Sequence, residues 1–534
     1  MKRIITCLLS SLLAGAALLS SAAPGPWLRI ENDRFWDTAD GQPIYSQGGG
    51  IFQFTDPATG EDRYYWYGVE YEECAKYRQN PAETLPNATF RNVTCYSSTD
   101  LVNWHFEANV MTPAEAFANG RRTWVGRLGV AYIPEVNKYA MVVQNGSLVM
   151  IALSDSPTGT FTEHQKINMT SRIGTSNTGD QTVFTDYDTG KSYLICSYGS
   201  GRNKAYVAEI GLCDDGKVGL KNCVEVFRGA GREGNCMFKY KGRYYLCASN
   251  LYGWDCSYAY YLVADDIYGP YLPVNDMQVM PGCGYDFAHV TQTGFFYTLK
   301  GSKQETVIYC GDRWCDFAGN GLGYNQWVPL SFASDGRTPH FNSLNAWELN
   351  PVTGEWRVAR DNNYVLNGSF EADRRPIPEA TKPRQDTLIG WNTVVVKGSI
   401  VSADEKDTPY LNYLNTEEDR HHVIGEKSLL INDHQPFERR VSQTLTPTAF
   451  VPLPKGRYEL RFKMRQKGGF STLIVFAESG GKRVEMALPG PAEAWQEVTL
   501  PVRVDGRKVR YGFEAVGDAD AWCIVDDISL KRKK

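Results

Sequence analysis

A strand-like pattern of aromatic and branched apolar residues recurs five times along the chain. Four of the copies follow a turn in which Gly or Asn precedes a charged or polar residue and then an aromatic residue. The copies lie roughly 50 to 75 residues apart, a spacing typical of propeller blades and other β repeats. Five copies over about 320 residues predict five four-stranded blades around a central axis, where residues distant in sequence can meet. The copies are Tyr64–Gly68, Lys138–Val142, Lys191–Ile195, Arg243–Cys247 and Thr306–Cys310.

The length and composition favour an all-β protein of two domains. A chain of 534 residues is too long for one hydrophobic core. Aromatic residues make up 13% and glycines number 50, which suits strands joined by many turns. The net charge of −5 shows no excess of the basic residues that bind phosphates, so no nucleic-acid partner is expected.

The first residues read as an export signal. Lys2 and Arg3 precede an apolar run through Leu19, and small residues follow, which predicts a signal peptide over residues 1–22. No other segment is apolar and long enough to span a membrane, so no transmembrane segment is expected. We therefore expect the mature chain to be periplasmic or secreted.

Twelve of the 13 cysteines follow this segment, an even number that permits disulfides in an oxidising compartment. Cys196, Cys247 and Cys310 nevertheless lie inside the apolar repeats, where cysteine behaves as a small buried hydrophobe. Free buried thiols are the favoured interpretation. The local pairs that remain open are Cys213 with Cys223 and Cys310 with Cys315.

A different pattern begins after Trp356. Its segments Asn367–Glu371, Gly390–Trp391, Lys427–Ile431 and Val525–Leu530 resemble, in this order, the jelly-roll modules of the galactose-binding-like type. Many of those modules bind carbohydrate. The fold class expected for the whole chain is therefore all-β, with a five-bladed β-propeller at residues 24–357 and a β-sandwich jelly roll at residues 362–534.

The module resemblance also implies a structural Ca²⁺ that joins the two ends of the jelly roll. Glu371 and Asp527 occupy the corresponding positions, and hard carboxylate oxygens are the ligands that Ca²⁺ prefers. Two unrelated surface carboxylates are the alternative. Trp391, Trp495 and Trp522 are candidates for stacking on sugar rings or for core packing.

Three segments of the repeat region resemble glycoside hydrolase family 43. They are Ser97–Trp104, Ser154–Gly159 and Asp266–Tyr271, and the resemblance covers most of residues 27–350. Two further stretches are similar to the exo-β-1,3-galactanase branch of that family. One is Gln47–Ile51 followed by Tyr64–Gly68, and the other is Gly311–Trp314 followed by Trp327–Leu330.

Glycoside hydrolysis requires a protonated carboxyl group that donates to the leaving oxygen. Glu233, ahead of the strand Met237–Tyr240, matches the place of the family's acid. Asp180 matches the Asp that tunes this acid, and a nearby negative charge favours the protonated form of Glu233. A solvated glutamate and a turn-capping aspartate are the alternatives.

The group that would act on the attacking water differs from that of most family members. Those members place an Asp where this chain has Gln47 and three glycines. The exo-β-1,3-galactanases also lack this Asp and use a fifth-blade Gln. Gln292 is the matching residue here, and it would position water or act through its imidic acid tautomer. The alternative is a Gln that only binds backbone.

A second departure affects specificity. The galactanases carry a Glu at the second blade where this chain has Gly126, and Ala-Pro where it has Gly234-Asn235. Losing a hydrogen-bonding partner changes sugar discrimination strongly, so β-1,3-galactan specificity is in doubt. The expected sugar contacts are Gln47, Tyr67, Glu70, Arg127, Tyr252, Trp254, His289, Asp312, Arg313 and Trp314.

We therefore expect an exo-acting, inverting glycosidase that releases a terminal sugar from plant polysaccharide side chains. Galactose from β-1,3-galactan or arabinogalactan is the first expectation. α-L-Arabinofuranosidase or β-xylosidase activity is the alternative within the family, and a non-catalytic carbohydrate-binding propeller is the alternative outside it. An oligosaccharide or polysaccharide is the expected partner, and no cofactor is expected for catalysis.

Overall fold

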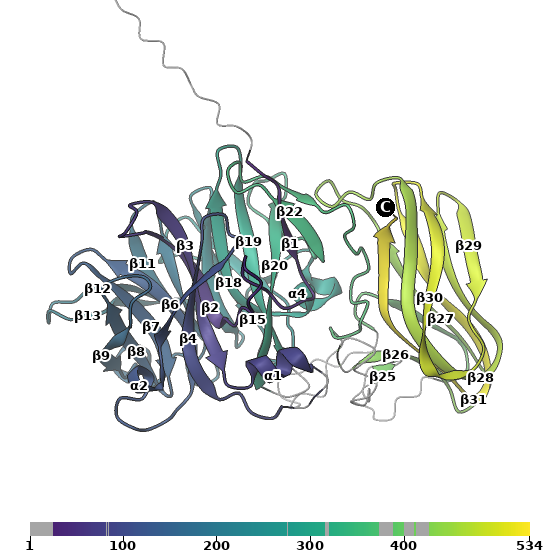
Figure 1. Cartoon of the computed structure of the whole chain (residues 1–534), viewed down its shortest axis with the longest axis horizontal. Helices are drawn as coiled ribbons and strands as arrows, with labels where there is room; N and C mark the ends of the chain where they lie inside the picture. The colour runs from purple at the N-terminus through teal and green to yellow at the C-terminus, as the bar shows by residue number, and fades with distance from the viewer. Residues whose placement is uncertain are drawn as a thin grey trace, which may run out of the picture.

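The computed structural model describes residues 25–533 except 82, 84, 275, 316–319, 373–387, 400–410, 413–424 and 426. The predicted signal segment lies outside the described residues. Figure 1 shows two β-rich bodies side by side, the N-terminal one in purple to green and the C-terminal one in yellow-green to yellow. No helix among the described residues has the length and apolarity required to cross a bilayer.

The N-terminal body contains the five predicted blades, each a four-stranded antiparallel sheet. Each of the five sequence repeats lies in the second strand of its blade, so the repeat pattern is confirmed strand by strand. The blades are β2 (Gln47–Thr55), β3 (Asp62–Tyr71), β4 (Phe90–Ser98) and β5 (His105–Met111); β6 (Val125–Ile133), β7 (Lys138–Asn145), β8 (Leu148–Ser154) and β9 (Thr162–Ile167); β10 (Gln181–Asp186), β11 (Lys191–Ser197), β12 (Lys204–Leu212) and β13 (Val218–Arg228); β14 (Glu233–Tyr240), β15 (Arg243–Ser249), β16 (Tyr260–Ala264) and β17 (Gln278–Val279); β18 (Gln292–Lys300), β19 (Glu305–Cys315), β20 (Asn320–Phe332) and β21 (Pro339–Phe341).

The first strands of the blades surround the axis. In order around the ring, β2 contacts β6, β6 contacts β10, β10 contacts β14, β14 contacts β18, and β18 returns to β2. Three of these strands begin at Gln47, Glu233 and Gln292. Because all five run in the same sense along the axis, their starting ends converge on one end of the propeller.

The short helices lie in the connections between strands. They are α1 (Cys74–Gln79), α2 (Pro113–Ala116), α3 (Thr170–Ile173), the 3₁₀ turn η1 (Cys283–Tyr285) and α4 (Phe287–Val290). Figure 1 shows α4 on the side of the propeller that faces the second body.

The start of the described chain is joined to the end of the propeller. A three-stranded sheet pairs β1 (Leu28–Glu31) with β22 (Ala346–Leu349), and β22 with β23 (Trp356–Val358). The register places Leu28 opposite Leu349. This sheet packs on a core that contains the fully buried Trp66, Trp104 and Trp327, whose rings contact one another at 4.8–6.0 Å.

The C-terminal body is the predicted β-sandwich. Its strands form one connected set in the order β24-β27-β31-β26-β25, with β28 pairing β29, β30 and β31. Alternate residues of β28, among them Tyr458, Leu460 and Phe462, are buried in the core. The strands are β24 (Asn392–Lys397), β25 (Leu411–Asn412), β26 (Ser428–Asn432), β27 (Phe437–Leu445), β28 (Gly456–Ser479), β29 (Lys482–Ala487), β30 (Ala492–Val504) and β31 (Val509–Arg532).

The cysteines whose side chains are described are free thiols. Cys213 and Cys223, a pair left open by the sequence, are both unpaired, and Cys310 is a free buried thiol. The side chain of Cys315 lies outside the described set. Burial in the blades raises the pKa of the thiols of Cys196, Cys247 and Cys310, which keeps them protonated and inert.

Candidate active site

A cavity of about 400 Å³ opens where the first strands of the blades begin. Its volume lies within the range typical of small-molecule sites. Residues from all five blades line it, as the propeller prediction required. The lining residues are Gln47, Gly48, Tyr71, Trp124, Gly126, Arg127, Gln144, Gly146, Asn177, Gly179, Asp180, Gly199, Arg202, Glu233, Gly253, Trp254, Gln292 and Trp314.

Glu233, the expected acid, is the first residue of β14 and is only 5% exposed. Its Oε1 accepts a hydrogen bond from Gln292 Nε2 at 2.9 Å, and its Oε2 pairs with the guanidinium of Arg202. Burial and the Asp180 carboxylate raise the pKa of Glu233 to about 8, against the lowering effects of Arg202, Arg127 and the Gln292 hydrogen bond. A carboxyl group that holds its proton at neutral pH has the property required of a general acid.

Asp180 lies beside Glu233, just ahead of β10. Its Oδ2 accepts the backbone N–H of Gly234 at 2.9 Å and lies 3.6 Å from Arg127 Nε. Gly234 has a φ of 60°, and a Cβ there would meet the carbonyl oxygen of Thr293 at 2.6 Å. The residue after the acid must therefore be glycine in this backbone, which lets its N–H turn toward Asp180.

Gln292 is held by three hydrogen bonds. Its Oε1 accepts from Arg127 Nη2 at 2.7 Å and from Trp314 Nε1 at 2.8 Å, while its Nε2 donates to Glu233. Two donors on one atom assign that atom as the amide oxygen. In the imidic acid tautomer, Oε1 would carry a proton that faces the two donors. The hydrogen bonds therefore favour the amide form of Gln292.

Arg127 joins the two sides of the site. Besides Gln292 and Asp180, its Nη1 donates to Asp312 Oδ2 at 3.0 Å. Asp312 also accepts from Gly48 N at 3.3 Å and Asn325 Nδ2 at 2.9 Å. Asp312 does not line the cavity; it holds Arg127 from behind.

Three tryptophans form one wall of the cavity. The rings of Trp254 and Trp314 lie 5.2 Å apart, and those of Trp124 and Trp254 lie 6.1 Å apart. The Trp124 ring explains the second-blade departure, because a Cβ on Gly126 would lie 2.3 Å from Trp124 Nε1. The indole thus occupies the space beside residue 126 in this chain.

Six expected sugar contacts lie outside the cavity lining, and Asp312, described above, is one of them. Tyr67 and Glu70 are on β3, a second strand one step from the axis: the Tyr67 hydroxyl donates to Pro157 O at 2.7 Å, and Glu70 binds Arg91 and Asn92. Tyr252 is buried beside Asn250, whose amide donates to its hydroxyl at 2.7 Å.

The last two of these six, His289 and Arg313, line a separate cavity between the two bodies. His289 lies on α4, and Arg313 points from β19 toward Asp33, at 3.9 Å. These six positions therefore lie away from the cavity that the other expected contacts line. Gln47, Arg127, Trp254 and Trp314 do line the cavity.

Several lining residues were not foreseen from the sequence. Arg202, which pairs with Glu233, comes from the loop between β11 and β12. Trp124 stands two residues before Gly126, whose departure from the galactanases was the available signal. Tyr71, Gln144 and Asn177 carry no motif of their own.

The structure places both expected calcium ligands beside lysine side chains. Glu371 accepts from Lys427 N at 2.8 Å, and Asp527 Oδ2 pairs with Lys463 Nζ at 3.0 Å. The fully buried carboxylate that senses the charge of Glu371 is Asp526, and its Oδ2 has no hydrogen-bond partner. Within the described ranges no group of three or more His, Cys, Asp or Glu side chains forms a metal site. A cation here would therefore use Glu371 and Asp526, with backbone oxygens.

The tryptophans of the sandwich divide between packing and the surface. Trp391 is buried, and its Nε1 donates to Asn367 O at 3.1 Å, which favours packing. Trp495 and Trp522 are half-buried, with the Arg465 guanidinium 5.3 Å and 5.9 Å from their rings.

Comparison with known proteins shows which family part of this chain resembles. Residues 57–310 match the model of the glycosyl hydrolases family 43. No curated protein sequence matches the chain. Among solved structures, the chain is similar to an exo-β-1,3-galactanase from Phanerochaete chrysosporium with β-1,3-galactotriose, at 20% identity and a TM-score of 0.54, over 94% of this chain and 100% of that one. It is also similar to an exo-β-1,3-galactanase from Clostridium thermocellum, at 22% identity and a TM-score of 0.51, over 77% of this chain and 81% of that one. At these identities the likeness shows the shared fold.

Proposed function

We propose that this glycosidase, whose residues 57–310 match the model of the glycosyl hydrolases family 43, is an exo-acting, inverting enzyme that releases terminal galactose from β-1,3-linked galactan. The observation that carries the proposal is the buried Glu233, bound by Gln292 and flanked by Asp180 in one cavity built by five blades. The two similar solved structures named above are exo-β-1,3-galactanases, which supports the choice of substrate.

In this proposal Glu233 gives its proton to the glycosidic oxygen as the bond to the leaving sugar breaks. Asp180 supports the protonated state of Glu233 through its negative charge. The tryptophan wall offers flat apolar faces against which a sugar ring stacks. The 400 Å³ volume suits a short terminal segment rather than a polymer threaded through the site.

Gln292 acts in this proposal on the attacking water. Its oxygen already accepts two hydrogen bonds, and one N–H is used by Glu233. The second N–H is the group that would hold the water oxygen. An amide donor orients water without accepting its proton, so Gln292 is a positioning group and a weak substitute for a carboxylate base.

We also propose that the chain is exported, on the strength of the signal-like residues 1–22, and that the sandwich binds glycan. The Trp495–Arg465–Trp522 arrangement supports the second point, since it presents two indole rings on one module. Fractionation of the producing cells and binding of the inactive full chain to insoluble galactan test these two statements separately.

The test of the activity is product release from β-1,3-galactan oligomers, arabinogalactan, arabinan and xylan. Glu233→Gln is assayed in parallel, because it keeps the size of the side chain and removes the acid. We expect galactose from β-1,3-galactan, with the inverted anomer seen first by proton NMR, and no turnover by the variant. Release of arabinose or xylose would name another substrate, and no release from any polymer would favour the non-catalytic binding propeller.

A further inference from the structure

The residues just before Gln292 adopt a left-handed turn. In α4, the four consecutive residues Phe287, Ala288, His289 and Val290 have φ values of 45°, 54°, 58° and 56°. Residues with a side chain rarely adopt this conformation even singly, and a bulky or β-branched residue such as Val290 is an outlier there. Thr291 then returns to extended backbone, and Gln292 opens β18.

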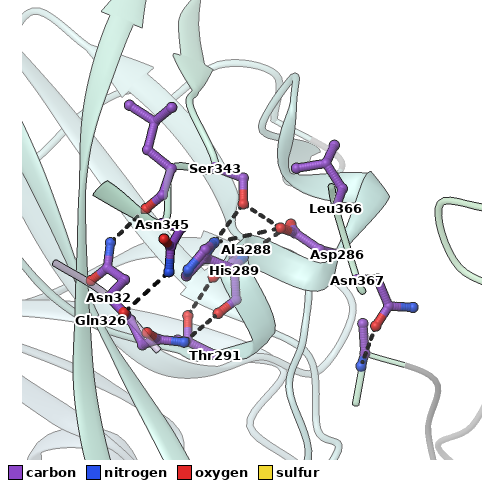
Figure 2. Close-up of polar contacts among 12 residues, drawn as sticks. Asn32, Asp286, Ala288, His289, Thr291, Gln326, Ser343, Asn345, Leu366 and Asn367 are labelled. Carbon is purple, nitrogen blue, oxygen red and sulfur yellow. Dashed lines mark hydrogen bonds and ion pairs between the residues drawn. The ribbon is translucent and has the colours of Figure 1, made fainter. Parts of the chain in front are cut away.

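Three side chains hold this turn, and Figure 2 shows them together. The carboxylate of Asp286 accepts the backbone N–H of His289 at 3.1 Å and the hydroxyl proton of Ser343. The hydroxyl of Ser343 also lies 2.6 Å from His289 Nδ1. We call Asp286, His289 and Ser343 the turn clamp, because together they link the turn to the segment after β21.

The imidazole of the clamp lies between two carboxylates. Its Nε2 is 3.4 Å from Asp33 Oδ1 and its Nδ1 is 3.6 Å from Asp286 Oδ2. Burial opposes the charge of His289, but Asp33 and Asp286 outweigh it and raise the pKa of His289 to about 10. Asp33 in turn is bound by Asn345 Nδ2 at 2.9 Å and by Gln326 Nε2 at 3.2 Å.

The turn is tied to the strands that build the active site. Gln326 Nε2, on β20, donates to the backbone oxygen of His289 at 3.1 Å, and Thr291 Oγ1 donates to Ala288 O at 2.6 Å (Figure 2). The same Thr291 hydroxyl contacts the Tyr309 hydroxyl on β19 at 2.7 Å. The direction in which Gln292 enters β18 is therefore set by the turn that the clamp holds.

The sandwich covers the outer side of this turn. Phe287 packs in one small cluster with Cys256 of the propeller and Ala372 of the following segment. Cys256 Sγ lies 3.7 Å from Ala372 O, and a Cβ on Gly390 would meet Tyr285 O at 2.5 Å. The second body thus packs directly against the segment that leads to Gln292.

From these contacts we propose that the turn clamp is a positioning device for Gln292, with His289 as its central residue. The clamp has no contact with the substrate cavity; it acts through two residues of backbone. The inference rests on the proposed function in one respect, namely that Gln292 takes part in hydrolysis.

A double-mutant cycle on the full chain tests the proposal. His289→Asn and Gln292→Ala are assayed singly and together, with His105→Asn, an exposed histidine of β5, as the control. A displacement of about 1 Å at a reacting group costs up to about 100-fold, so we expect His289→Asn to lower kcat by roughly 10- to 100-fold with KM nearly unchanged. Because His289 acts through Gln292, the double variant should be no slower than Gln292→Ala alone. If the losses of kcat in the two single variants multiplied in the double variant, the proposal would be overturned.

A pH profile separates positioning from loss of folded protein. The Gln292 hydrogen bond lowers the pKa of Glu233, so a displaced Gln292 should move the alkaline limb of activity to higher pH in His289→Asn, as in Gln292→Ala. Loss of folded protein alone leaves the limb in place, and that result would contradict the proposal. Should His289→Asn fail to fold, Ser343→Ala removes the two clamp contacts of its hydroxyl without removing a charge. The same cycle and pH profile are then run with Ser343→Ala.

Crystal structures of the variants decide the question independently of turnover. We expect the Gln292 Nε2 to Glu233 Oε1 distance to lengthen from 2.9 Å in His289→Asn or Ser343→Ala, but not in His105→Asn. If the wild type is inert on every glycan, the proposed function fails while this distance still tests the clamp. An unchanged turn and an unchanged distance would overturn the clamp, whatever the activity.

Discussion

Gln292 donates from Nε2 to Oε1 of Glu233 at 2.9 Å, so the proposed water-positioning group touches the proposed acid. In inverting glycosidases the acid and the water-side group lie on opposite faces of the sugar, about 6.5–9.5 Å apart. The contact therefore describes a resting site, in which the two groups hold one another before a sugar separates them.

The first prediction is that substrate opens this contact. In a crystal structure of Glu233→Gln with a β-1,3-galactose oligomer, we expect the side chains at 233 and 292 to be separated by the terminal ring. A retained contact beside a bound sugar would instead make Gln292 a holder of the acid, and the water-side role would be wrong. The ligand-free variant in the same crystal form is the control.

The second prediction concerns pH. The active form of Glu233 is protonated, so activity should persist up to a pH near 8 and fall above it, since the pKa of Glu233 is about 8. Asp180→Asn removes a charge that raises this pKa and should move the alkaline limb to lower pH. Arg202→Gln removes a charge that lowers it and should move the limb to higher pH. The kcat/KM profiles of the three proteins measure the limb, and shifts in the same direction would contradict this electrostatic account.

The third prediction concerns the tryptophan wall. Trp254→Ala removes an apolar face for the sugar ring, and burying a side chain of this kind is worth about 1.5–3 kcal/mol, so KM should rise roughly 10- to 150-fold. Trp27→Ala, at a tryptophan that packs on Arg357 away from the cavity, is the matched control and should leave KM unchanged. Initial rates across substrate concentrations provide the comparison. An equal KM in the two variants would place sugar binding elsewhere.

The fourth prediction concerns the contact between the two bodies at Gly390 and Tyr285. Gly390 has a φ of 76°, and an added Cβ would meet Tyr285 O at 2.5 Å. Gly481 has a φ of 71° with open space around it, so it carries the same backbone cost without the clash. Each Gly→Ala change costs about 1 kcal/mol for the backbone, and Gly390→Ala should lower the Tm further than Gly481→Ala. Equal Tm values in thermal unfolding would show that close packing of Gly390 on Tyr285 does not contribute to stability.

The fifth prediction concerns a cation in the sandwich. Asp526 Oδ2 is buried without a hydrogen-bond partner near Glu371, an arrangement that a bound Ca²⁺ would satisfy. We expect Ca²⁺ to raise the Tm of the wild type after treatment with a chelator, and Asp526→Asn to abolish that rise. Asp518→Asn is the control on the same strand. A Tm that does not respond to Ca²⁺ would contradict a calcium site at these carboxylates.

The blades were predictable because their signal is local. Residues such as Tyr65 and Leu194 repeat in apolar strands after short turns, and each lies in the second strand of its blade. Glu233, Asp180 and Gln292 were predictable for a related reason: each stands at or next to the start of a first strand, where a propeller brings residues to its axis.

Some expected contacts lie away from the cavity because of geometry that the sequence does not display. Tyr67 lies one strand away from the axis, where its hydroxyl binds Pro157, and nothing in an alternating strand shows that distance. His289 is three residues from Gln292, yet the left-handed turn carries its side chain out toward the second body. Arg202 reaches Glu233 from a loop, and loops give no periodic signal.

The pairing of β1 with β22 has a consequence for the order in which the chain acquires its structure. Leu28 finds its partner only at Leu349, so this sheet cannot form while the blades between them are still being made. At a synthesis rate of about 5–20 residues per second, that interval is about 15–60 s. During it, the inner edges of the early blades face no neighbour on one side. The unfinished propeller therefore exposes these edges throughout that interval.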